Sequence, residues 1–284
     1  MKNLWKHSPA RFKIGLVVMT FLLIMAFIVT LFYTGPDITH FNTYSRNLGR
    51  SRQNLLGTTA MGQDIFWMLL ISLRNSISIG VIVGIIGTVV GCIWGLVSGF
   101  LGDTVDRIMM SVSDTFIIIP VLPILILMTA LIGGAMGMLG LALILGLFAW
   151  AHPSRHIRAV CLSLRERDFV QTARFSGEGT FQIITTEILP YLWTWALSNF
   201  MNAILVAIGT ETTLAILGLS SATLPTLGNM IQWARARGAI MTSVMGQTYW
   251  YWIASPIVLC VIFFVSLFAL ISGYNVYFAK RRGV

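Results

Sequence analysis

Charged residues are scarce in this chain. Asp, Glu, Lys and Arg make up 10% of its 284 residues, whereas hydrophobic residues make up 56%. A soluble globular domain carries about a quarter charged residues, so this composition excludes an ordinary soluble domain and indicates a membrane protein. In such a protein the net charge of +9 is no sign of nucleic-acid binding, because the distribution of Lys and Arg between loops is the informative quantity. We expect no nucleic-acid partner.

Cysteine and lysine are also few, which excludes two kinds of site. Cys92, Cys161 and Cys260 form no disulfide framework and lack zinc-site spacing, so we expect them to be small apolar fillers. None of the lysines follows a glycine, which excludes a phosphate-binding P-loop. This chain is therefore not expected to hydrolyse ATP by that route.

Histidine offers no better basis for catalysis. His152 and His156 lie four residues apart, but Pro153 interrupts them and no carboxylate lies between them, so we predict no metal site. Serine proteolysis within the membrane needs a base such as histidine, and no histidine lies in an apolar segment. We predict that the chain is not an enzyme and has no catalytic residue.

Six segments are long and apolar enough to cross a bilayer, which takes about 20 residues per helix. They are residues 14–33, 76–100, 108–132, 134–151, 191–217 and 253–274. The first is too long for the apolar core of a signal peptide and no A-x-A cleavage site follows it, so we expect it to be retained. The sequence predicts an all-α, multi-pass membrane protein with six transmembrane helices.

The basic residues predict the orientation of these helices. If the amino terminus is cytoplasmic, 13 of the 19 Lys and Arg residues lie on the cytoplasmic side. Because cytoplasmic loops are enriched in Lys and Arg, we expect cytoplasmic termini at residues 1–13 and 275–284. Residues 34–75 are then an extracytoplasmic loop, and residues 152–190 are a cytoplasmic loop within a five-helix domain of residues 76–274.

Glycine and proline mark two of the predicted spans. Span two carries glycines at helical spacing, namely Gly80, Gly84, Gly87, Gly91, Gly95 and Gly99. Small residues on one helix face let another helix approach closely, and we favour packing within the chain over a subunit interface.

Pro120 and Pro123 predict a bend in span three. Before span two, residues 65–75 have apolar residues three or four apart, which predicts an amphipathic helix on the outer surface.

Two acids, Asp114 and Glu211, are the ionisable groups that we place at membrane depth. Acids buried in a membrane are functional candidates by default. No His, Lys or Arg lies within the predicted spans to complete a proton relay. We therefore favour structural hydrogen bonding for both acids.

The polar loop has an internal pattern of its own. Residues 162–176 mix apolar and charged groups at helical spacing and predict a helix. Gly177 and Gly179 should end that helix, and Phe181, Ile183 and Ile184 should begin a second short helix that ends before Pro190. Phe181 and Ile184 would be poor choices for a solvated connector, so this loop is predicted to be a docking surface.

These residues resemble a known family. The order of Gln171, Thr172 and Ala173, then Gly177, then Leu189 and Pro190 resembles the EAA loop of the membrane subunits of binding-protein-dependent ABC importers. The stretch "LSLRERDFVQTARFSG…ILP" is similar to the C-type permease of dipeptide, oligopeptide and nickel importers, as are "LGTTAMGQDIFWMLLISLRNSISIG", "GTETTLAILGL" and "LPTLGNM". Three positions depart from the family pattern: Gln171 replaces the usual glutamate, Thr172 an alanine and Gln63 an arginine.

The resemblance implies a type I ABC importer permease fold that forms half of a transmembrane pathway for a peptide-type solute. It implies contact with a separate ATPase through Gln171, Thr172, Ala173, Gly177, Phe181, Ile184, Leu189 and Pro190. The implied partners are a second homologous permease, two ATPase subunits that bind ATP and Mg²⁺, and an extracytoplasmic solute-binding protein, while this chain itself holds no cofactor.

The solute stays open, because the family also carries oligosaccharides and nickel complexes. A stand-alone secondary transporter or channel is a competing class, and it predicts charges within the membrane and transport without an ATPase. A membrane enzyme is a third class, and it predicts a clustered catalytic set. The predicted spans contain neither a charge relay nor such a set.

Overall fold

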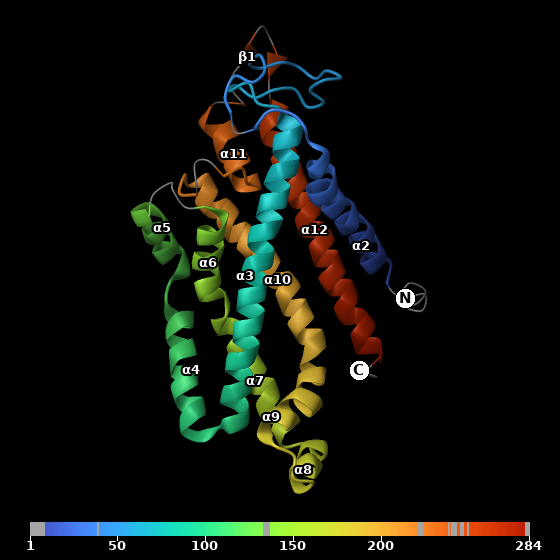
Figure 1. Cartoon of the computed structure of the whole chain (residues 1–284), viewed down its shortest axis with the longest axis vertical. Coiled ribbons are helices and arrows are strands. Elements are labelled where there is room, and N and C mark those ends of the chain that lie inside the picture. The colour runs from blue at the N-terminus through green and yellow to red at the C-terminus, as the bar shows by residue number, and fades with distance from the viewer. Residues whose placement is uncertain are drawn as a thin grey trace. The chain divides into compact units, whose positions relative to one another are not determined.

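The computed structural model describes most of the chain as helices (Figure 1). The described residues are 9–38, 40–132, 137–220, 224–237, 239, 243–244, 247–248 and 250–281. Residues 1–8 and 282–284 of the expected cytoplasmic termini lie outside this range. The elements are α2 (Ala10–Leu23), η1 (Ile24–Ile28), η2 (Val29–Phe32), α3 (Ile65–Leu101), α4 (Asp103–Ile118), α5 (Val121–Ile132), α6 (Met138–Ala149), α7 (Ala151–Arg165), α8 (Asp168–Phe175), α9 (Thr180–Ile183), η4 (Ile184–Ile188), α10 (Leu189–Ile216), α11 (Leu227–Ala236), β1 (Ser243–Val244), β2 (Gln247–Thr248) and α12 (Trp250–Arg281).

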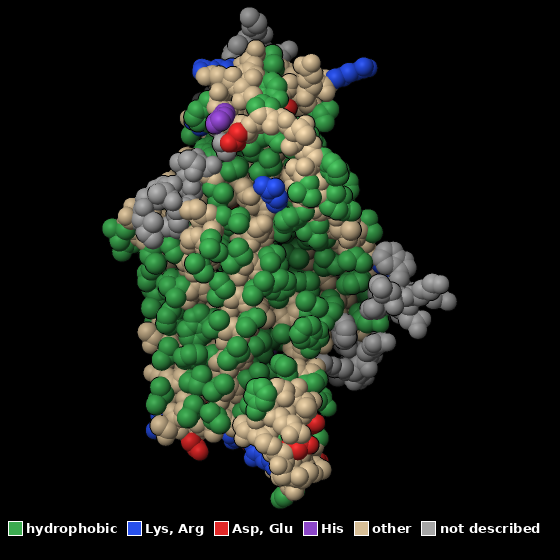
Figure 2. Space-filling view, viewed as in Figure 1, with side chains coloured by type: hydrophobic (Ala, Val, Ile, Leu, Met, Phe, Trp, Pro, Cys, Tyr) green, Lys and Arg blue, Asp and Glu red, His purple; other side chains and the backbone are tan. Residues whose placement is uncertain are grey.

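Five helical stretches of the described residues are long and apolar enough to cross a membrane, and a bent helix pair makes a sixth. The five are Ala10–Phe32, Ile65–Leu101, Met138–Arg165, Thr180–Ile216 and Trp250–Tyr277, and the pair is α4 with α5. Hydrophobic side chains dominate the face shown in Figure 2, where charged side chains are few. The predicted all-α membrane fold is confirmed, and the antiparallel ladder of β1 and β2 adds only two residues per strand.

The predicted bend in span three is a complete break between helices. The backbone of Ile119 is extended after α4, Pro120 follows, and α5 begins at Val121 with its axis turned by 76°. The residue before a proline avoids the helical region because the proline ring crowds it. Pro123 lies in the first turn of α5, where its missing N–H would have no helical partner in any case.

The start of α3 differs from the prediction. Residues 65–75 are the first turns of the spanning helix itself, and not a separate helix on the surface. Ile65, Met68 and Ser72 are buried, so their helical spacing reflects packing against the protein. The amphipathic pattern was correct, but it did not indicate which partner covers the apolar face.

Asp64 begins this helix as its N-cap. Its Oδ1 accepts hydrogen bonds from the backbone N–H groups of Phe66 (2.8 Å) and Trp67 (3.1 Å), and its Oδ2 accepts one from the Asn54 side-chain amide (2.8 Å). An N-cap carboxylate satisfies donors that have no helical partner. Burial raises the pKa of the Asp64 carboxyl above its ordinary value, and these three hydrogen bonds partly offset that rise.

The chain forms two compact units. The first holds the described residues of 1–79, 126–141 and 208–277, and the second holds residues 80–125 and 142–207 with the described residues of 278–284. In the first unit α2 packs closely against α12, since a Cβ atom at Gly15 would lie 2.8 Å from the carbonyl oxygen of Ser266. The second unit contains the glycine face of α3 and the polar segment that follows α7.

The glycines of span two pack against helices of the same chain. Added Cβ atoms at Gly87, Gly91, Gly95 and Gly99 would each press on α6, α7 or the junction between them. At Gly95 the added atom would lie 2.8 Å from Ile157 Cβ and closer still to the carbonyl oxygen of Ser154. The prediction of packing within the chain is confirmed for these four positions.

The glycine face generates a stability prediction. Gly95→Ala should destabilise the purified protein by about 1–3 kcal/mol, because the new methyl group overpacks the contact with α7. Gly209→Ala is the matched control, since Gly209 also lies within a helix but has nothing within 4 Å of the added atom; there alanine should be neutral or stabilising. Thermal unfolding in detergent measures both, and equal midpoints for the two variants would contradict the prediction.

Asp64 generates a pH prediction. Because its folded-state pKa is raised by burial, its contribution to stability is present at low pH and is lost as the pH rises through that pKa. Asp64→Asn cannot titrate, so the unfolding midpoint of the wild type minus that of the variant should be larger at about pH 4 than at about pH 7.5. A difference that is constant or that grows with pH would refute this.

Candidate functional site

The polar segment of residues 166–188 connects α7 to α10 and begins with a corner. The predicted single helix over residues 162–176 is wrong, because α7 ends at Arg165 and α8 begins at Asp168. Arg165 holds the corner at both ends: its guanidinium donates to the carbonyl oxygen of Phe100 (3.3 Å), and its own carbonyl oxygen accepts from the Gln171 side-chain amide (3.3 Å). The helical spacing continues across the corner, which is why periodicity alone missed it.

Gly177 ends α8, as predicted. Its φ is +82°, a left-handed conformation that glycine adopts without strain. The Gly177 N–H donates to the Arg174 carbonyl oxygen (3.0 Å), and the Glu178 N–H donates to the Ala173 carbonyl oxygen (3.2 Å). This pair of bonds is the Schellman arrangement, which satisfies the last carbonyl groups of a helix.

The second predicted helix does not end before Pro190. Helix α9 continues through the π-helical turn η4 into α10 without a break. Proline lacks an N–H and its ring crowds the carbonyl group four residues earlier. The wider π turn lies just before Pro190 and changes the hydrogen-bond register there, so the helix can pass through a proline that should have ended it.

A buried core ties the polar segment to the spans of its unit. It contains Leu96, Phe100, Ile157, Cys161, Val170, Ala173, Ile183, Ile188 and Leu192. These residues come from α3, α7, α8, α9, η4 and α10. The Arg174 guanidinium also lies over the Phe100 ring, 5.1 Å from its centroid. The segment is therefore a packed extension of the helices and not a loose connector.

The residues predicted to contact an ATPase divide by exposure. Phe181 is 80% exposed, and Thr172, Gly177, Leu189 and Pro190 are also exposed. Gln171 and Ile184 are partly buried. Ala173 is buried in the core just described, so it supports the surface from within and cannot form part of it.

Sequence reasoning missed Phe175, the most exposed aromatic side chain of this segment at 90%. It is the last residue of α8 and lies two residues before Gly177, on the side of the helix opposite Val170 and Ala173. The signal was present as an aromatic residue outside the apolar stripe of a short amphipathic helix. Phe175 and Phe181 thus flank the Gly177 turn with exposed rings.

Glu211 accepts hydrogen bonds from two hydroxyl groups. Its Oε1 accepts from the Thr226 hydroxyl (2.7 Å), and the Ser220 hydroxyl lies 3.4 Å away. Thr226 is also the N-cap of α11, because its Oγ1 accepts from the Asn229 N–H (3.1 Å). Glu211 therefore fixes the start of α11 to α10 within the first unit.

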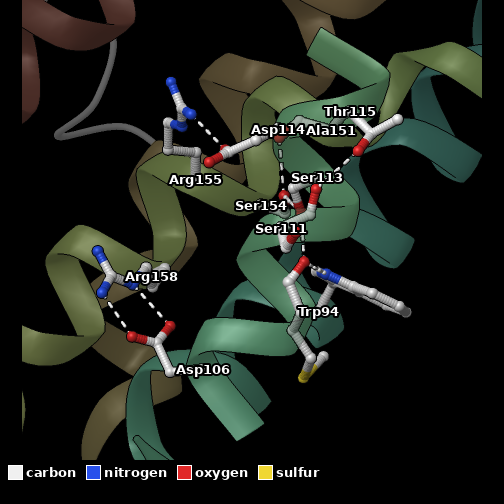
Figure 3. Close-up of polar contacts among 11 residues, drawn as sticks. Trp94, Asp106, Ser111, Ser113, Asp114, Thr115, Ala151, Ser154, Arg155 and Arg158 are labelled. Carbon is white, nitrogen blue, oxygen red and sulfur yellow. Dashed lines mark hydrogen bonds and ion pairs between the residues drawn. The ribbon is translucent and has the colours of Figure 1, made fainter. Parts of the chain in front are cut away.

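Asp114 accepts a hydrogen bond from the Arg155 guanidinium, and the two side chains form an ion pair (Figure 3). The expectation did not include this partner, because the fourth spanning stretch continues to Arg165 and carries Arg155 and Arg158 beyond the expected span. Arg158 forms a second ion pair, with Asp106, its Nε lying 2.7 Å from Oδ1. Asp106 lies just before the expected third span and therefore outside the predicted membrane depth.

The two ion pairs join the antiparallel helices α4 and α7. Between them the hydroxyl groups of Ser113 and Ser154, both fully buried, lie 3.1 Å apart (Figure 3). Trp94 of α3 completes the contact by donating to the Met109 carbonyl oxygen (3.0 Å). The helix that leads into the polar segment is thus fixed to α4 by charge and to α3 by close packing.

Comparison with known proteins identifies the family. The family described as "Binding-protein-dependent transport system inner membrane component" matches residues 87–284. The chain belongs to this family. The match contains the whole polar segment, both ion pairs and Glu211. The family consists of membrane transport permeases and is not a class of enzymes.

Individual relatives agree with this family. The chain is 30% identical over 270 residues to the oligopeptide transport system permease protein OppC of Lactococcus lactis subsp. lactis, which covers 93% of this chain and 89% of the relative. It is 28% identical over 213 residues to the dipeptide transport system permease protein DppC of Bacillus subtilis, covering 72% and 63% of the two chains. The resemblance to a C-type permease of ABC importers is confirmed.

The N-cap of α11 generates a prediction. Thr226→Val should lower the unfolding free energy by about 1–2 kcal/mol, because it removes both the helix cap and a hydrogen bond to Glu211. Thr213→Val is the control, since the exposed Thr213 hydroxyl, within the described residues, bonds only to the Gly209 carbonyl oxygen one turn earlier. Chemical or thermal unfolding in detergent distinguishes the two variants, and equal losses would show that the cap contributes nothing of its own.

Proposed function

We propose that this permease carries peptides and receives force from a separate ATPase through residues 166–188. The observation that carries the proposal is the two-sided construction of this segment. Its inner side is a core shared with α3, α7 and α10, while Phe175 and Phe181 are exposed on its outer side. Exposed aromatic residues on a rigid support are typical of protein interfaces.

The proposed assembly contains this chain, a second homologous permease, two ATPase subunits and an extracytoplasmic solute-binding protein. ATP and Mg²⁺ are bound by the ATPase subunits. The excess of Lys and Arg in residues 1–13, 152–190 and 275–284 supports cytoplasmic termini and a cytoplasmic segment of residues 166–188. The peptide solute is supported by the names of the relatives, which are oligopeptide and dipeptide permeases.

The contacts of the second unit define the route by which force from the ATPase would reach α4. Displacement of Phe175 and Phe181 moves Ala173 and Ile183, which pack in the same core as Ile157 of α7. The arginines of α7 then carry the movement to α4 through their ion pairs. Packed interiors transmit such shifts because they resist compression.

The exposed rings generate the test. Replacing Phe175 and Phe181 together by alanine should reduce ATP-driven uptake of trialanine into proteoliposomes by about tenfold or more, since truncation of an interface aromatic residue costs about 2 kcal/mol. Copurification of the ATPase subunits should weaken in parallel. The unfolding midpoint of the permease alone should not change, because both side chains are largely exposed.

Phe41→Ala is the matched control, since Phe41 is a 63% exposed phenylalanine outside the polar segment. It should leave uptake at the wild-type rate. Uptake that persists in the double alanine variant, or that proceeds in wild type without ATP or any ATPase, would overturn the proposed function.

A further inference from the structure

One face of α4 is polar along its whole length, although α4 is half of a candidate span. Asp103, Arg107, Ser111, Asp114 and Thr115 recur at intervals of three or four residues, which places them on one side of the helix. Asp103, Arg107, Ser111 and Thr115 are exposed and Asp114 is half-exposed. This face is distinct from the one that carries Ser113, which is buried against Ser154 of α7.

A groove of about 720 Å³ lies along this face. It is lined by Asp103, Asp106, Arg107, Met110, Ser111, Asp114, Thr115, Ile118 and Arg158. Pockets for small molecules commonly have about 300–1,000 Å³. Charges of both signs are costly against lipid, so water or a polar ligand is the favourable environment for this groove.

The two ion pairs beside the groove differ in their number of hydrogen bonds and in the exposure of their side chains. Asp106 accepts from both Nε and a terminal nitrogen of Arg158 and also from the Ser98 hydroxyl (2.6 Å), and its side chain is 14% exposed. Asp114 meets Arg155 through one nitrogen, and the side chains of Arg155 and Asp114 are 54% and 42% exposed. An exposed single-contact pair contributes little net stability, so a cationic ligand can replace Arg155 at Asp114.

Arg107 supplies the opposite charge. It forms no ion pair within the described part of the chain. It lies seven residues before Asp114, which corresponds to about 10 Å along a helix axis. An extended tripeptide spans a similar length, at about 3.3–3.6 Å per residue.

We propose that this groove holds both ends of a short zwitterionic peptide, with the ammonium group at Asp114 and the carboxylate at Arg107. This inference rests on the proposed function, because it concerns the transported peptide. The peptide ammonium replaces the Arg155 guanidinium at Asp114, while the Asp106 pair keeps α4 fixed to α7. The groove would therefore select for free peptide ends within the permease.

The test uses the complete importer with a single new cysteine, Ser111→Cys, between the two charges. We expect a water-soluble thiol reagent to label this cysteine above the background of the unmodified protein, and trialanine to slow the labelling at least fivefold. N-acetyl-trialanine amide, which lacks both charges, should give no protection. Thr115→Cys serves as a second probe position should Ser111→Cys fail to assemble.

Two substitutions separate ligand binding from a structural ion pair. Asp114→Asn and Arg155→Gln both remove the same pair, but only the second keeps the carboxylate. Asp114→Asn and Arg107→Gln should each abolish protection by trialanine, whereas Arg155→Gln should strengthen it. Equal loss of trialanine protection in Asp114→Asn and Arg155→Gln would show that the ion pair is structural, and it would overturn the inference.

Other outcomes also test whether the groove binds the peptide ends. A cysteine that cannot be labelled from water would assign the face to lipid or to the second permease, and equal protection by the blocked peptide would exclude recognition of the peptide ends. Uptake of trialanine by the same wild-type importer is measured in parallel. Absent uptake would overturn the proposed function, whereas uptake without protection would overturn the groove alone.

Discussion

The close contact between the glycine face of α3 and helix α7 is the constraint on which the second unit depends. Because Gly91, Gly95 and Gly99 carry no side chains, the backbone of α7 lies directly against α3. This proximity fixes the rotation of α7 about its axis. As a result Ile157 and Cys161 point into the core, while Arg155 and Arg158 reach the acids of α4. A larger side chain at any of these three glycine positions would displace both the core residues and the arginines of α7.

The same contact explains how a polar segment can be rigid at the end of an apolar bundle. A segment of about 20 residues with many polar groups would ordinarily be mobile, because ordering it costs conformational entropy. Here each short piece contributes buried side chains to one core: Val170 and Ala173 from α8, and Ile183 and Ile188 from the α9 and η4 turns. The Schellman bonds at Gly177 satisfy the backbone at the one sharp reversal. Polar exposure and structural order are therefore compatible in this segment.

Much of the fold could be predicted because the signals were local and strong. Long apolar segments give the spanning helices, glycine spacing gives the close contact, and Gly177 gives the helix end. The errors arose where a distant partner decides the outcome. Arg155 and Arg158 are unfavourable in a spanning helix unless acids such as Asp106 and Asp114 lie beside them, and Pro190 should end a helix unless a π turn precedes it. Ala173 belongs to a family motif, but the motif does not reveal that its methyl group is buried.

Gln171 is the residue at which the structure most changes the interpretation. A glutamate at this position offers a carboxylate to a partner, whereas an amide can donate a hydrogen bond. The Gln171 amide donates to the Arg165 carbonyl oxygen and so closes the corner between α7 and α8. An ionised carboxylate has no proton to donate, so a glutamate could not make this bond. Residue 171 is therefore turned toward its own segment in this chain, and the exposed rings of Phe175 and Phe181 are left as the principal surface for a partner. The contact proposed here consequently depends on apolar burial, and it should be less sensitive to salt than a contact made by a glutamate.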